Sequence, residues 1–200
     1  MKRGFTLIEM LVVIGIIAVL IAASVASFGG STRKAEIAKG RELVSNVSTA
    51  LATIYQKGGR WPSGLVKANG SDENRLGEKP AIVLAQKNAL SLSYSSKSGL
   101  LGDDRFGVVD PWGMKVLKGN SKANLNSNVP SGGTVRDHIL RFAIDVDGTG
   151  ITSANVCGQQ IRVRAPAIVW STGPDGKFGK LDEMGRSDDI FSFTAGQIVK

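Results

Sequence analysis

One charged residue lies inside the long apolar segment that opens this sequence. A short basic leader, Lys2-Arg3-Gly4, precedes Phe5, and an apolar run then extends to Phe28 with Glu9 as its single charge. A carboxylate at the centre of a bilayer costs about 2.5 kcal/mol or more, so such a charge usually has a partner. Cleavage after Gly4 would create a protonated α-amine on Phe5, and Glu9 of one copy could then pair with Phe5 of the next.

Three other interpretations of this segment stay open. A secretory signal peptide would be cut near Ser24-Val25-Ala26, but the apolar stretch is longer than a usual signal core and contains Glu9. Residues 10–28 could instead anchor a periplasmic enzyme, because about 20 apolar residues at about 1.5 Å each cross a bilayer. That interpretation leaves Glu9 and the Gly4-Phe5 junction unexplained. A buried core helix is the third, although 200 residues leave little other core to surround it.

The leader junction resembles a known processing signal. The segment GFTLIEMLVVI, residues 4–14, is similar to the class III signal of type IV pilins and of type II secretion pseudopilins. In that family a membrane peptidase cuts after the glycine and methylates the new amine. The resemblance therefore implies cleavage between Gly4 and Phe5, methylation of Phe5, and a role for Thr6 in aligning Glu9. The basic leader predicts a cytoplasmic N-terminus and a periplasmic remainder at the bacterial inner membrane.

Composition limits the other classes of function. Two hundred residues suit one modest domain plus an anchor. The net charge is +8, but Lys and Arg are scattered, which indicates a solvated surface and no nucleic-acid partner. Cys157 is the single cysteine, so an internal disulfide cannot form. The single His138 supports neither a metal cluster nor a catalytic triad.

An amphipathic helix is predicted after the apolar segment. Ser31 or Thr32 could cap it, and Gly58-Gly59 are expected to end it just after Lys57. Gly29-Gly30 are expected to interrupt or bend the long helix at the membrane boundary. The apolar residues recur at helical spacing and form one stripe that we expect to pack on a sheet: Ile37, Val44, Val47, Leu51 and Ile54.

Short elements are predicted in the remainder of the chain. Trp61 and Pro62 are expected to pack their loop against the long helix, residues 63–79 to be exposed turns, and residues 81–90 to form a short helix. Asp110-Pro111-Trp112-Gly113 resembles a tetrapeptide that precedes the first strand in pseudopilins, so residues 114–118 are expected to be a strand. Further strands are predicted over residues 140–146, 165–171 and 190–193.

This order of elements predicts an α+β, pilin-like fold, in which a long N-terminal helix packs on a small antiparallel sheet with long loops. The expected organisation is a leader at 1–4, a transmembrane and assembly helix at 5–28, the amphipathic half of the helix at 29–57, and a periplasmic globular head at 58–200.

An acidic loop near the C-terminus suggests a metal. Residues 171–176 and 188–193 resemble the C-terminal loop of the major pseudopilin, which binds calcium in that family. Calcium takes about six to eight oxygen ligands, and the resemblance implies that these include carboxylates of Asp175, Asp189, Asp188 and Asp182. A solvated loop with acidic turns is the other interpretation. Residues 145–150 also look like the start of an EF-hand, but Val156 stands where the bidentate glutamate belongs, which indicates a hairpin turn.

Taken with the resemblance, these features favour a pseudopilin that is cleaved after Gly4, N-methylated, and polymerised into a periplasmic pseudopilus for type II protein secretion. Its partners would be further copies in a helical homopolymer, the prepilin peptidase and methylase, minor pseudopilins, the inner-membrane assembly platform and the lipid bilayer. The alternative within the family is a type IV pilus subunit used in adhesion, twitching or DNA uptake. An anchored periplasmic enzyme is a third possibility, for which the sequence offers no nucleophile–base pair.

Overall fold

The computed structural model describes residues 6–70, 72–86, 106–120, 122–181 and 188–199. For residues 22–31, 72, 78, 85 and 86 it describes the backbone alone. The chain divides into two compact units, Met1–Glu36 and Ile37–Lys200. The first helix contributes residues to both units.

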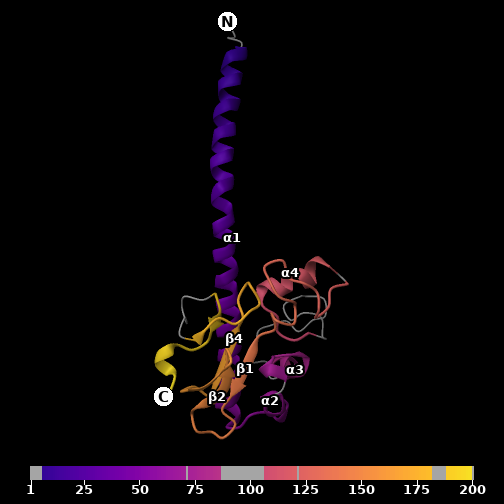
Figure 1. The fold of residues 1–200 in the computed structure, drawn as a ribbon, viewed down its shortest axis with the longest axis vertical. Coiled ribbons are helices and arrows are strands. Elements are labelled where there is room, and N and C mark those ends of the chain that lie inside the picture. The colour runs from indigo at the N-terminus through magenta and orange to yellow at the C-terminus, as the bar shows by residue number, and fades with distance from the viewer. Residues whose placement is uncertain (1–5, 71, 87–105, 121, 182–187, 200) are drawn as a thin grey trace. The chain divides into compact units, whose positions relative to one another are not determined.

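That helix, α1, extends over 52 residues from Leu7 to Gly58 (Figure 1). Its backbone is helical through Gly29 and Gly30, so the expected interruption there, with a second helix capped by Ser31 or Thr32, is wrong. A glycine costs a helix only about 1 kcal/mol relative to alanine, and a helix of this length tolerates two of them. The predicted end is confirmed, because Gly59 has φ 64° and its amide donates to the Tyr55 carbonyl at 2.8 Å.

The predicted apolar stripe of α1 packs into the main core of the second unit. Val44, Val47, Leu51 and Ile54 are buried there against Phe142, Ile144, Val169 and Ile190 of the sheet, and Ile37 is partly buried beside them. Complete burial of one such side chain contributes about 1.5–3 kcal/mol. The helix also approaches the sheet closely at Gly40, where an added Cβ would lie 2.6 Å from Cδ1 of Ile190. The stripe therefore fixes residues 37–58 on the sheet.

Three strands form the sheet that carries this core. Strands β1 (Arg141–Ile144), β4 (Ala167–Ser171) and β5 (Ile190–Phe191) are antiparallel in the order β1-β4-β5. They confirm the strands predicted over 140–146, 165–171 and 190–193, and with α1 they confirm the α+β class. Strands β1 and β4 lie side by side in Figure 1.

A separate hairpin pairs β2 (Thr152–Val156) with β3 (Gln159–Val163) and is not among the predicted strands. Its turn residues, Cys157 and Gly158, both have positive φ, 54° and 78°. Residues 145–150 turn the chain from β1 to β2, but these two strands belong to different sheets, so the turn does not close a hairpin. Asp145 accepts from the Gly150 amide at 2.6 Å within that turn.

Two further predictions of secondary structure are wrong. Residues 114–118 belong to a helix, α4 (Pro111–Gly119), because Asp110 accepts from the amides of Trp112 and Gly113 and caps the first turn. Residues 63–79 are not exposed turns, since Leu65 and Leu76 are fully buried. They form α2 (Ser63–Ala68) and a 3-10 turn, η1 (Asp72–Asn74).

Further short helices are α3 (Glu78–Gln86) and a 3-10 turn, η3 (Ala195–Gln197). Helix α3 bears out the helix predicted over 81–90 but begins earlier, and residues 87–90 lie outside the described part of the chain. Helices α2 and α3 pack against each other (Figure 1).

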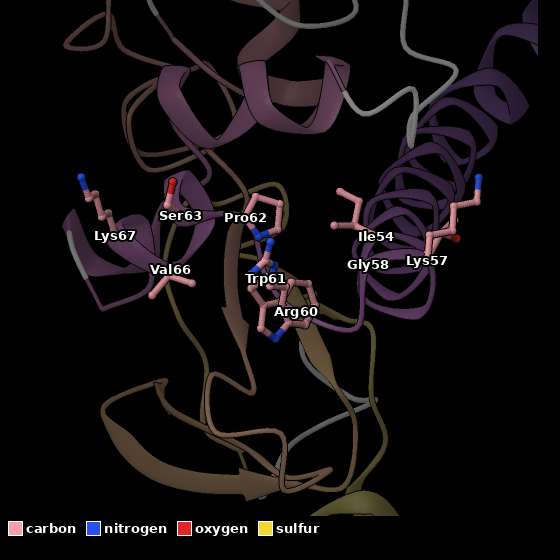
Figure 2. Close-up of a pocket in the computed structure, with 10 residues that line it drawn as sticks. Ile54, Lys57, Gly58, Arg60, Trp61, Pro62, Ser63, Val66 and Lys67 are labelled. Carbon is pink, nitrogen blue, oxygen red and sulfur yellow. The ribbon is translucent and has the colours of Figure 1, made fainter.

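A groove lies between the last turn of α1 and α2 (Figure 2), with a volume of about 880 Å³. Trp61 lines it and is buried, with its ring stacked on Tyr55 at a centroid distance of 4.9 Å. The Trp61 indole N–H donates to the Asp145 carbonyl at 2.6 Å. These contacts confirm that Trp61 packs its loop against the long helix.

Candidate assembly site

Thr6 and Glu9 cap the N-terminus of α1 reciprocally. The Thr6 amide and hydroxyl donate to the same oxygen of Glu9, Oε2, at 2.8 and 2.9 Å. The Glu9 amide lies 3.3 Å from the Thr6 hydroxyl oxygen, which accepts from it. This is the capping-box arrangement, and it places the carboxylate at the positive end of the helix dipole. Glu9 therefore has a hydrogen-bond partner within its own chain.

Large apolar side chains surround α1 just beyond this cap. Leu7 is 84% exposed and Val19 69%, and the large hydrophobics between Leu7 and Ile21 are all exposed, the least of them being Val13 at 44%. Because successive positions are apolar, they face all sides of the helix, which is typical of a helix surrounded by lipid or by other helices. Among the side chains that the structure describes, no helix has the length and apolarity needed to cross a membrane.

The predicted processing residues, Gly4 and Phe5, lie outside the described residues. Cleavage at their junction, methylation of Phe5, and pairing of Glu9 with the amine of a neighbouring copy stay predictions. The structure does bring Thr6 to Glu9, the residue that the motif expects it to align.

The acidic C-terminal loop is partly described. Asp175 accepts from the Lys177 amide at 2.9 Å, and Asp189, which is buried, accepts from the Gly179 amide at 2.8 Å. The backbone of Asp188 packs against Gly173, so the two ends of the loop lie together. Asp182 lies outside the described residues. Among the described residues, no group of three or more Asp, Glu, His or Cys side chains is placed so that it could hold a metal ion. A calcium ligand set stays a prediction.

A network of buried hydrogen bonds connects distant segments of the globular unit. No pattern in the sequence predicts it. Asp110 Oδ2 accepts from the Ser171 hydroxyl at 2.9 Å and lies 3.0 Å from His138 Nδ1. His138 Nε2 lies 2.9 Å from the Gly132 carbonyl. Ser171 donates to the carboxylate and not to the imidazole, so the three residues are not arranged as a Ser-His-Asp triad. The network connects the cap of α4 to strand β4 and to the loop before β1.

Both ring nitrogens of His138 face acceptors, a carboxylate and a carbonyl. A neutral imidazole can donate from only one nitrogen, whereas the protonated ring donates from both. Burial lowers the pKa of His138, but the hydrogen bond and charge of Asp110, the Gly132 carbonyl and the charge of Asp137 outweigh it and raise the pKa above its ordinary value. The site therefore favours an imidazolium inside the core.

Comparison with known proteins identifies a sequence motif in the N-terminal segment. Residues 1–25 match the family model described as the prokaryotic N-terminal methylation motif. The chain is also 29% identical over 116 residues to the type IV major pilin protein PilE1 of Neisseria gonorrhoeae, covering 58% of this chain and 64% of that one. The chain thus carries the N-methylation motif of type IV pilin-like proteins and is similar to type IV pilins of Neisseria.

The chain is also similar to a fimbrial protein of Neisseria meningitidis serogroup A, with 23% identity over 115 residues, which are 58% of this chain and 68% of the relative. A fimbrial protein of Neisseria meningitidis serogroup B is 22% identical over 115 residues, which are also 58% of this chain and 68% of the relative. No solved structure matches the chain. The relatives support the pilin-like family and do not single out pseudopilins within it.

Proposed function

We propose that this protein is the structural subunit of a type IV filament, cut after Gly4, methylated on Phe5, and polymerised through the N-terminal part of α1. The observation that carries the proposal is the position of Glu9, a single carboxylate in an apolar helix surface, within the methylation motif at residues 1–25. A subunit of this kind is stored in the bacterial inner membrane and leaves it when it joins the filament.

Assembly follows from the chemistry of the cap. In the free subunit the Glu9 carboxylate accepts two hydrogen bonds from Thr6. Cleavage adds a cationic amine four residues before Glu9, and the amine of a neighbouring copy offers the carboxylate a charged donor. A hydrogen bond to a charged group contributes about 1.5–3 kcal/mol, more than a neutral one. The exposed apolar side chains from Leu7 to Ile21 would then pack between copies.

Among filament types, we place the pilus subunit first because the relatives above are fimbrial and pilin proteins. The second candidate is the major pseudopilin of type II secretion, which the sequence resemblances at residues 110–113 and 171–176 favour. Helix α4 follows the first of these motifs where a strand was expected, which reduces that resemblance. Deletion of the gene separates the two: loss of surface fibres supports a pilus subunit, and loss of protein secretion with surface fibres intact supports a pseudopilin.

The processing step is tested by mass spectrometry of the native protein. We expect a mature chain that begins with N-methylated Phe5, because cleavage after Gly4 creates the amine that Glu9 needs. A mature chain that keeps the leader, or begins elsewhere, contradicts the proposal.

The pairing step is tested by replacing Glu9 with alanine in cells that make filaments. Glu9→Ala is expected to insert and to be processed normally, but to lower the yield of sheared filaments by about tenfold or more, because each contact loses a charged hydrogen bond. Glu42→Ala is the matched control, since Glu42 is an exposed carboxylate on the same helix. A normal filament yield from Glu9→Ala would falsify the pairing mechanism.

Calcium at the acidic loop is a separate proposal, supported by the resemblance alone. We expect calcium to raise the melting temperature of the protein above its value in chelator, and Asp175→Ala to remove that difference. Asp147→Ala, in the exposed turn after β1, is the control that should keep it. Equal melting temperatures with calcium and with chelator would exclude the site.

A further inference from the structure

The groove between the last turn of α1 and α2 (Figure 2) has an apolar floor. Ile54, Trp61 and Val66 line it; the first two are buried and Val66 is half-buried. Its volume of about 880 Å³ is in the range of about 300–1,000 Å³ that ligand-binding clefts occupy. All of its lining belongs to the second unit, so binding there is independent of the pairing proposed for Glu9.

Three exposed cations form the rim of this groove. Lys57 lies on the α1 side, Lys67 on the α2 side, and Arg60 between them (Figure 2). The described lining contains no acidic residue, and none of the three cations makes an ion pair with another described side chain. The rim therefore favours a negatively charged occupant.

The floor is held in place by the fold itself. The Trp61 ring stacks on Tyr55, and its N–H donates to the Asp145 carbonyl at 2.6 Å. Helix α2 packs on α3 so closely that a Cβ added at Gly64 would lie 2.8 Å from Cγ2 of Val83. A preformed surface of this kind lowers the entropy that a partner loses on binding.

The distribution of charge favours a peptide over a small anion. A small-molecule site directs a few polar groups toward one enclosed ligand, whereas these cations are exposed and lie on both sides of the groove. An apolar centre with a polar rim is the usual anatomy of a protein–protein contact, in which tryptophan and arginine are enriched. The net charge of +8 disfavours a second copy of this chain as the acidic partner.

We propose that this groove is a docking site for an acidic segment of a different protein. Apolar side chains of that segment fill the floor at Trp61 and Val66, and carboxylates on either side of them face Lys57, Arg60 and Lys67. The apolar contact supplies most of the affinity, while the cations select for charge and speed the association.

The test measures binding of a synthetic peptide to the full-length protein in phosphatidylcholine nanodiscs. The fluorescein-labelled probe is Glu-Glu-Leu-Leu-Glu-Glu, its fluorescence anisotropy is recorded, and empty nanodiscs give the blank. We expect saturable binding that weakens as the salt concentration rises, because the charged contacts are exposed. The matched peptides Gln-Gln-Leu-Leu-Gln-Gln and Glu-Glu-Ser-Ser-Glu-Glu lack the charge or the apolar centre, and each should bind at least about tenfold more weakly.

Variants of the rim locate the binding. Lys57→Gln/Lys67→Gln removes two exposed charges, so we expect it to fold normally and to bind the acidic peptide about fivefold more weakly. Lys118→Gln/Lys122→Gln is the matched control, because it removes two exposed charges outside the groove and should leave binding unchanged. Equal losses in the two double variants would show that net charge alone attracts the peptide, which overturns the inference.

The wild-type titrations can also overturn it. An absence of saturable binding, or equal binding of the glutamate and glutamine peptides, excludes the acidic docking site. Because the full chain is present, a segment of this chain that fills the groove also appears as an absence of binding. Displacement of the probe from the wild type by the Lys57→Gln/Lys67→Gln protein would identify a second copy as the occupant and would likewise contradict the proposal.

Discussion

Trp61 and Trp170 are both buried indoles, but their N–H groups are in opposite situations. The Trp61 N–H donates to the Asp145 carbonyl at 2.6 Å, and the Trp170 N–H has no acceptor among the described residues. Trp61→Phe leaves a carbonyl unpaired, whereas Trp170→Phe removes an unpaired donor, and both remove a similar volume. We expect the free energy of unfolding to fall by about 1–3 kcal/mol more in Trp61→Phe than in Trp170→Phe. Urea denaturation of both variants measures this, and equal losses would contradict it.

His138 predicts how stability depends on pH. Its pKa is raised in the folded protein, for the reasons given above, so the folded state holds the proton more tightly than the unfolded chain does. The stabilisation is complete below about 6.5, the ordinary histidine pKa, and is lost as pH rises through the higher folded pKa. The stability advantage of the wild type over His138→Gln should therefore shrink with rising pH from that point. Denaturation at a series of pH values tests this, and a constant difference would contradict it.

At the scale of elements, Asp110 supports α4 and the core at the same time. Its Oδ1 caps the helix, while its Oδ2 accepts from Ser171 and faces His138. Loss of a helix cap costs about 0.5–2 kcal/mol, but Asp110→Ala also leaves a buried imidazolium without its carboxylate, a change of about 3–5 kcal/mol.

We therefore expect Asp110→Ala to lower the free energy of unfolding by about 3 kcal/mol or more. Asn120→Ala at the other end of α4 is the control, because Asn120 accepts one exposed amide bond from Lys122, and it should cost below about 1 kcal/mol. Chemical denaturation compares the two. A loss in Asp110→Ala no larger than a helix cap would mean that the buried network contributes little.

Helix α4 is an element that the sequence did not predict correctly, whereas other elements were predictable. The stripe on α1 and the strands at 140–146 and 165–171 were predictable, because their apolar spacing is local. The resemblance at residues 110–113 predicts a strand over residues 114–118, although Asp110 followed by Pro111 is also a helix-start pattern. The partners of Asp110 lie 28 and 61 residues away in sequence, so spacing could not reveal them. The Arg141–Trp170 pair likewise depends on strand register.

At the scale of the whole molecule, the core residues of the described structure belong to the second unit, from Val44 onward. We expect the fragment Ile37–Lys200 to unfold cooperatively on heating, because it keeps the complete stripe of α1. A fragment that begins at Ala52 lacks Val44, Val47 and Leu51, and it loses about 1.5–3 kcal/mol for each. That sum is comparable with the total stability of a domain, about 5–15 kcal/mol.

Circular dichroism with thermal melting distinguishes the fragments. The longer one should show a sigmoidal transition and the shorter one a gradual change. A longer fragment without a transition would mean that the globular unit depends on residues before Ile37.

The reciprocal cap between Thr6 and Glu9 has a consequence for the energetics of the proposed filament. A carboxylate that is already accommodated by its own chain exchanges one set of donors for another when a neighbour arrives, so the net gain is the difference between two bonded states. Such an exchange favours growth and retraction near equilibrium, in which subunits return to the bilayer without ever exposing an unpaired anion to hydrocarbon.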